Sequence, residues 1–168
     1  MCKIFLRLKN EPFNPTKLTR ELKNIVIILP ANIFYKTETL SKTEFSEIIS
    51  EINDFIRKFG DKVVILKPEG EEYLLPGARV VNYSPPVRIL SRQFFRLKKV
   101  LRSLNPDVSI DLNKKDDILS YLVGAKMRLG TQRSRFINCR LLIDTKNIDY
   151  SEMCEKLIDL FYKFAWKE

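Results

Sequence analysis

Short apolar runs alternate with longer amphipathic stretches along this chain. The runs are rich in Val, Ile and Leu and only a few residues long, which is typical of strands that are buried on both faces of a sheet. They predict strands at residues 25–29, 63–66, 80–83, 108–112 and 127–129, and one more at residues 141–144.

The stretches between these runs have the spacing of amphipathic helices. Ser41 and Glu44 form a capping box ahead of a helix that ends at Gly60, and Asn113 can cap a helix that ends at Gly124. Further helices are expected over residues 88–104 and 149–164. The alternation predicts an α/β fold: a single three-layer Rossmann-like domain with a mainly parallel sheet, covering residues 24–168 after a basic lead-in at residues 1–23.

Composition narrows the chemistry. The chain has no histidine, which excludes Ser-His-Asp and Cys-His nucleophile systems and His-ligated zinc within one chain. With five glycines it has no phosphate loop of the P-loop or dinucleotide type, so we expect no cofactor and no metal. The three cysteines are odd in number and contain no Cys-x-x-Cys, which favours a reducing compartment and a cytoplasmic protein.

The charge balance favours an anionic partner. Thirty Lys and Arg against twenty-one Asp and Glu give a net charge of +9. Such an excess suits a phosphosugar, an acidic membrane surface or nucleic acid. No RRM, KH or helix-turn-helix signature is present, so nucleic acid ranks last among these partners.

A basic stripe lies on the helix expected at residues 88–104. Arg88, Arg92, Arg96 and Lys99 follow one another at spacings of four, four and three, opposite an apolar stripe of Leu90, Phe94, Leu97, Leu101 and Leu104. This surface could sit on acidic lipid or a phosphate-rich partner, which would place the protein at the inner face of the membrane. It could equally be a solvated face, because Lys and Arg are good helix formers without any ligand.

A second group of polar residues follows the strands at 108–112 and 127–129. The carboxyl ends of parallel strands share one edge, where open α/β sheets usually bind ligands. We therefore expect a ligand site in which Lys114, Arg133 and Arg135 contact an anion, Asp111 and Asn113 orient hydroxyls, and Arg128 joins them or pairs with Asp111 or Asp144. Replacing Arg133 and Arg135 with Ala should then weaken anion binding. A surface loop without a ligand is the alternative.

The same region resembles a known family. PDVSIDLN (residues 106–113) followed by GAKMRLG (residues 124–130) is similar to the end of the N-terminal, acceptor-side domain of heptosyltransferase-type glycosyltransferases, glycosyltransferase family 9. The resemblance covers roughly residues 24–164 and implies one half of a GT-B enzyme. These enzymes carry a catalytic Gly-Asp pair after the first strand, whereas this chain has Pro30, Ala31 and Asn32.

The resemblance thus implies a stand-alone, degenerate half, without the domain that holds the nucleotide sugar. We expect no sugar transfer by the isolated chain and a role in binding an anionic sugar, a lipid or a partner subunit. The alternative is a subunit of a split glycosyltransferase, working with a second glycosyltransferase-like chain or as a homo-oligomer. Nucleic-acid binding is the third possibility.

Overall fold

The computed structural model describes residues 22–29, 42–70, 75–113, 118–143 and 148–165, and in these segments the strands form one parallel sheet. Its order is β3-β2-β1-β4-β5-β6, the strand order of the Rossmann fold. The strands are β1 (Ile25–Ile28), β2 (Val63–Pro68), β3 (Arg79–Tyr83), β4 (Val108–Asp111), β5 (Met127–Gly130) and β6 (Cys139–Arg140). The predicted α/β, Rossmann-like fold class is confirmed.

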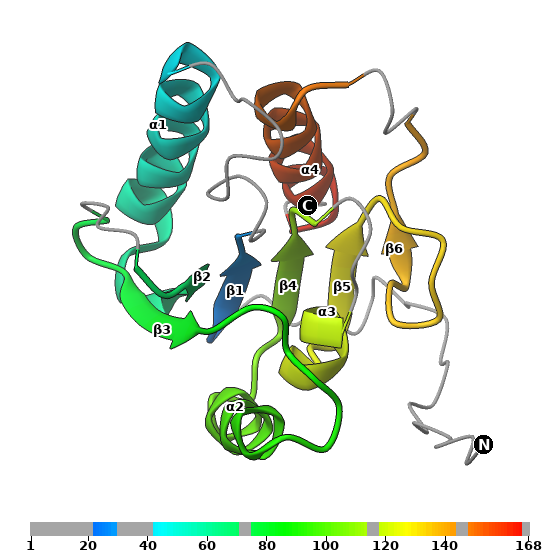
Figure 1. Ribbon diagram of the computed structural model, residues 1–168. Coiled ribbons are helices and arrows are strands. Elements are labelled where there is room, and N and C mark those ends of the chain that lie inside the picture. Colours follow the sequence, from blue (N-terminus) through cyan, green and yellow to red (C-terminus); the bar gives the residue numbers. More distant parts are fainter. Residues whose placement is uncertain (1–21, 30–41, 71–74, 114–117, 144–147, 166–168) are drawn as a thin grey trace.

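Helices cover both faces of this sheet, which makes three layers (Figure 1). On one face lie α1 (Lys42–Phe59), followed by a short 3-10 turn (Gly60–Lys62), and α4 (Tyr150–Ala165). On the other face lie α2 (Arg92–Ser103) and α3 (Ile118–Val123). No helix in the described segments is both long enough and apolar enough to cross a bilayer.

Strand β1 is apolar throughout because both of its faces are buried. In β1, Ile25 and Ile27 pack toward α1 and α4, while Val26 and Ile28 pack toward α2 and α3. Ile25 is in register with Val63 of β2 and with Val108 of β4, so equivalent residues of three strands form one layer. This arrangement produces the continuous apolar runs seen in the sequence.

The last strand differs from the prediction. The structure pairs Cys139 and Arg140 with the end of β5, and the predicted strand at 141–144 is wrong over its described residues. The N–H of Leu141 still donates to the carbonyl of Gly130 at 2.9 Å, but β5 ends there and offers no further partner. Leu142 is 78% exposed. The apolar residues 141–143 therefore follow β6 at the edge of the sheet without forming a strand.

The start of α2 also differs. The predicted helix began at residue 88, whereas Ser91 is the N-cap and its side chain accepts a hydrogen bond from the N–H of Phe94 at 3.1 Å. Arg88 thus precedes the helix, and Leu90 is 57% exposed instead of lying on the buried stripe. The φ of Leu90 is +67°, in the left-handed region of backbone conformation. This conformation is about 1–2 kcal/mol less stable than the right-handed one for any residue other than glycine.

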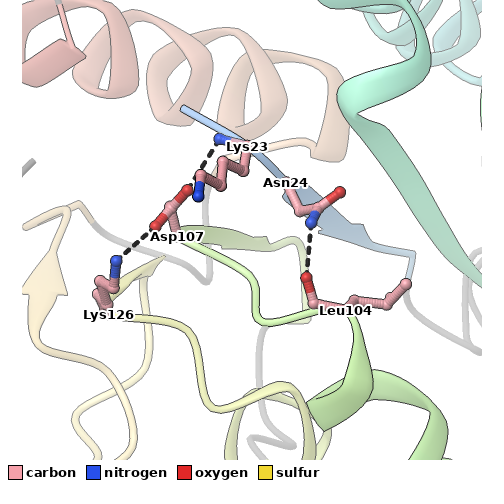
Figure 2. A network of polar contacts seen from close by, with 5 residues as sticks. All are labelled: Lys23, Asn24, Leu104, Asp107 and Lys126. Carbon is pink, nitrogen blue, oxygen red and sulfur yellow. Dashed lines mark hydrogen bonds and ion pairs between the residues drawn. The ribbon is translucent and has the colours of Figure 1, made fainter. Parts of the chain in front are cut away.

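A polar network fastens the amino ends of three strands (Figure 2). The buried carboxylate of Asp107 accepts the N–H of Lys23 at 2.8 Å and the ammonium of Lys126 at 2.7 Å. Nearby, the side-chain amide of Asn24 donates to the carbonyl of Leu104 at 2.6 Å. These contacts join the segments that enter β1, β4 and β5.

This network makes stability depend on pH. Burial alone would raise the pKa of Asp107, but hydrogen bonds from Lys126 and the N–H groups of Lys23 and Asn24 hold it below its usual range. A lowered carboxyl pKa adds stability above the pKa of the unfolded chain, and this stability is lost as the pH falls through the folded value. We expect Asp107→Asn to lower the free energy of unfolding by about 1–3 kcal/mol at neutral pH.

The free energy of unfolding is measured by urea denaturation at neutral pH and at about pH 3. The lower value is chosen because an aspartate in an unfolded chain has a pKa of about 4 and is mostly protonated there. The difference between Asp107→Asn and the parent should shrink at the lower pH. Asp61→Asn, which changes an exposed carboxylate, is the matched control. An equal loss for Asp107→Asn at both pH values would contradict the assignment.

Candidate functional site at the carboxyl edge of the sheet

Asp111 ends β4 at the point where the strand order reverses, beside β1. Its carboxylate is fully buried. One oxygen accepts the backbone N–H of Asn113 at 2.9 Å and its side-chain amide at 2.8 Å, and the other accepts the hydroxyl of Ser120 on α3 at 2.5 Å. Asp111 therefore links the end of β4 to the first residues of the loop and to α3.

The loops that follow β4 and β5 meet, as expected for adjacent parallel strands. The side-chain amide of Gln132 donates to the carbonyl of Asn113, and both residues are buried. The rest of the second loop turns outward, with Arg133 and Arg135 exposed and the Arg135 guanidinium 5.0 Å from the ring centre of Phe136. These arginines face solvent beside the point where the loops join.

Arg128 is held by the protein's own backbone. Its Nε donates to the carbonyl of Phe136 at 2.7 Å and its Nη1 to the carbonyl of Ala125 at 3.0 Å. Burial, and to a smaller extent the neighbouring charge of Arg102, lowers the pKa of Arg128. The guanidinium thus fixes the loop between β5 and β6, whereas the sequence analysis expected Arg128 to join the ligand contacts or to pair with Asp111 or Asp144.

The other candidates in this group fall outside the described residues. Lys114, Asp144 and the segment Pro30, Ala31 and Asn32 belong to parts of the chain whose structure is not described. The ligand-binding role assigned to Asp111, Asn113, Lys114, Arg128, Arg133 and Arg135 stays a prediction.

A pocket of about 310 Å³ lies beside the carboxyl ends of β2 and β3, against the first turns of α2. Its walls are Glu69, Ser84, Arg92, Gln93 and Arg96. The Glu69 carboxylate accepts the hydroxyl of Ser84, and the side-chain amide of Gln93 donates to the carbonyl of Ser84 at 2.8 Å. These bonds fix the far wall of the pocket relative to the helix.

The two arginines give the pocket a positive wall. Arg96 lies 3.9 Å from the Glu69 carboxylate, at the limit of an ion pair, and both side chains are about half exposed or more. Arg92 is one turn earlier on the same side of α2. With two guanidinium groups and one carboxylate, the lining of the pocket as a whole keeps a net positive charge.

These groups suit a particular kind of ligand. The planar forks of Arg92 and Arg96 match phosphate or carboxylate oxygens, and Glu69 can accept hydroxyl hydrogens. Among the described residues, no cluster of His, Cys, Asp or Glu is placed to hold a metal ion. Burial raises the pKa of the Cys139 thiol to about 11 and that of Cys154 to about 12, so neither is a ready nucleophile.

Two of the five residues that line this pocket were identified from the sequence. Arg92 and Arg96 were identified as members of a basic stripe, together with Arg88 and Lys99. Glu69, Ser84 and Gln93 carry no motif. Glu69 and Ser84 do directly follow β2 and β3, and the preference of ligands for the carboxyl ends of strands is the signal that could have singled them out.

The fold and the pocket define an α/β domain of Rossmann strand order with a basic, polar pocket. The sequence matches no protein-family model and no curated protein. A solved structure, the glycosyl transferase family 9 protein from Veillonella parvula, is similar to 82% of this chain at 15% identity, with a TM-score of 0.47. The chain spans 40% of the length of that protein.

Proposed function

We propose that this chain is a glycosyltransferase-like binding domain that takes a phosphorylated or carboxylated sugar into the pocket beside α2. The observation that carries this proposal is the pair Arg92 and Arg96, which line one wall of a pocket whose other wall offers Glu69 and Ser84. A ligand with both an anionic group and hydroxyls matches the two walls. The similarity of residues 106–130 to heptosyltransferase-type enzymes supports a sugar ligand within the same proposal.

The size of the pocket limits the ligand. About 310 Å³ is at the lower end of the range for small-molecule sites, which favours one sugar ring with its anionic group over a whole nucleotide sugar. The binding role is proposed as noncatalytic. Transfer from a nucleotide sugar by the purified 168-residue chain would contradict that part.

The test is binding of a sugar phosphate, with glucose 1-phosphate as the probe, by thermal shift and calorimetry. A ligand at about a hundred times its dissociation constant stabilises the folded state by about 2.7 kcal/mol. Arg92→Gln with Arg96→Gln should weaken binding at least about tenfold, because hydrogen bonds to charged groups contribute about 1.5–3 kcal/mol each. The free protein should keep its melting temperature, since exposed ion pairs contribute about 0–1 kcal/mol.

The matched comparison removes the same charge elsewhere on this edge. Arg133→Gln with Arg135→Gln changes two exposed arginines of the β5–β6 loop, which is the site predicted from sequence. If this second variant loses binding and the first does not, the ligand belongs to the loop. If both bind as the parent does, the proposed site is wrong.

A further inference from the structure

The outer face of α2 and the turn before it combine large apolar side chains with basic ones. Ile89, Leu90 and Phe95 are 46%, 57% and 52% exposed. Arg88 and Lys99 are exposed beside them, and the α2 sequence contains no acidic residue. We refer to these five residues as the α2 face.

Helix geometry places the charges around the aromatic ring. Arg92 and Lys99 lie three residues before and four residues after Phe95, so they flank it on one side of α2. The opposite stripe of the helix is buried against the sheet and consists of Phe94, Leu97 and Leu101. Because the buried stripe of α2 faces the sheet, Phe95 lies on the side of the helix that is exposed to solvent.

The preceding turn presents two more apolar side chains at its tip. The N–H of Ser91 donates to the carbonyl of Arg88 at 3.1 Å, which closes a turn with Ile89 and Leu90 at its centre. A positive φ at the second central position is normally taken by Gly or Asn. Leu90 adopts it at +67° while it is largely exposed, and strained backbone of this kind is typical of functional positions.

Charge is distributed unequally between the two helical layers. The five ionisable side chains of α2 are all basic: Arg92, Arg96, Lys98, Lys99 and Arg102. On the opposite side of the sheet, α1 and α4 together carry more acidic than basic residues. An anionic surface would therefore attract the layer that carries the α2 face and repel the other layer.

We propose that the α2 face binds the surface of an anionic lipid bilayer. Ile89, Leu90 and Phe95 enter the interface between headgroups and acyl chains, and Arg88 and Lys99 contact the headgroups. A small cluster of exposed apolar side chains ringed by basic ones suits this partner better than an acidic protein, because a bilayer accepts the apolar groups without a shaped pocket. This inference does not depend on the sugar pocket.

The test is co-sedimentation of the full chain with vesicles at a salt concentration of about 0.1 M. At this concentration the Debye length is about 10 Å, so basic side chains at the surface still interact with anionic headgroups. The parent should bind vesicles of equal parts phosphatidylglycerol and phosphatidylcholine, and it should not bind pure phosphatidylcholine. Arg88→Gln and Lys99→Gln should each weaken binding roughly fivefold, the effect of one basic residue near an anionic surface.

Leu90→Asn separates membrane binding from stability. It should weaken vesicle binding about tenfold by removing an inserted side chain. Its melting temperature should stay the same or rise by a few degrees, because Asn tolerates the positive φ. Leu142→Asn is the matched control, since Leu142 is 78% exposed and lies next to β6, an edge strand of the sheet, outside the α2 face. It should bind vesicles as the parent does.

Three results would overturn the proposal. The first is a parent protein that shows no preference for anionic vesicles, and the second is an equal loss of vesicle binding in Leu90→Asn and Leu142→Asn. The third is a protein that binds no vesicles and forms a dimer in solution that Phe95→Ser dissociates. The last result would make the α2 face a contact between copies of this chain. Glucose 1-phosphate binding by Leu90→Asn serves as the separate readout for the sugar pocket, so either proposal can fail without the other.

Discussion

Asp111→Ala is expected to lower the free energy of unfolding by about 3–5 kcal/mol, because it leaves several buried donors without an acceptor. The buried carboxylate accepts hydrogen bonds from the backbone N–H and the side-chain amide of Asn113 and from the hydroxyl of Ser120. Removing it leaves those donors without an acceptor in a site that water does not reach, and each such group costs about 1–3 kcal/mol. Since a domain is stable by only about 5–15 kcal/mol, the variant should be close to unfolding at room temperature.

Urea denaturation measures this effect, and Asp111→Asn is the informative control. An Asn side chain has nearly the shape of Asp and can still accept a hydrogen bond from Asn113. Asp111→Asn should therefore lower the free energy of unfolding clearly less than Asp111→Ala does. The comparison also decides what Asp111 does, because the sequence placed it among residues that orient a ligand. A variant Asp111→Ala that kept its stability and lost only sugar-phosphate binding would favour the ligand role over the structural one.

The strands were predictable because the sheet is buried on both faces. All four residues of β1 are apolar and buried, and in β4 Val108 and Ile110 alternate with the buried polar residues Ser109 and Asp111, so both strands appear as short runs rich in Val and Ile. Parallel pairing followed from the helices between these runs. The predicted ends of both strands fall within one residue of the observed ends.

The errors occur where apolar residues lie on the surface. Leu90 fitted the helical spacing of the buried stripe on α2, but the cap at Ser91 starts the helix after it. Leu142 lies in an apolar run that pairs with no strand in the described segments. Periodicity records which residues are apolar and not which neighbours are available, so it assigned both leucines to buried elements.

The residues that carry the family resemblance, 106–113 and 124–130, mostly stabilise the unit formed by β4, α3 and β5. Asp107 and Lys126 form an ion pair at the amino ends of β4 and β5, and Asp111 links β4 to α3. Arg128 fixes the loop after β5. A short similarity in such a unit is informative about the fold, whereas the pocket beside α2 is built from residues outside it. The similarity therefore carries information about the architecture, while the ligand-site residues stay a prediction.

Gly124→Ala is expected to lower the free energy of unfolding by about 2–3 kcal/mol, from two separate causes. The φ of Gly124 is +60°, which disfavours any residue with a side chain. A Cβ atom would also lie 2.0 Å from the Cζ atom of Arg102, whose guanidinium covers this glycine. Arg102 would have to move and give up its 3.0 Å hydrogen bond to the carbonyl of Tyr121 near the end of α3.

Two comparisons separate the backbone cost from the clash. Gly60 has a φ of +59°, and a Cβ added there would meet nothing within 4 Å, so Gly60→Ala should show the backbone cost alone, about 1–2 kcal/mol. In an Arg102→Ala background, Gly124→Ala should cost no more than Gly60→Ala does in the parent, because the clashing side chain is gone. The two substitutions would then be non-additive, as expected for residues in contact. Additive losses in this cycle would mean that Arg102 does not cover Gly124 in solution, and that α3 ends without the arginine over its last carbonyls.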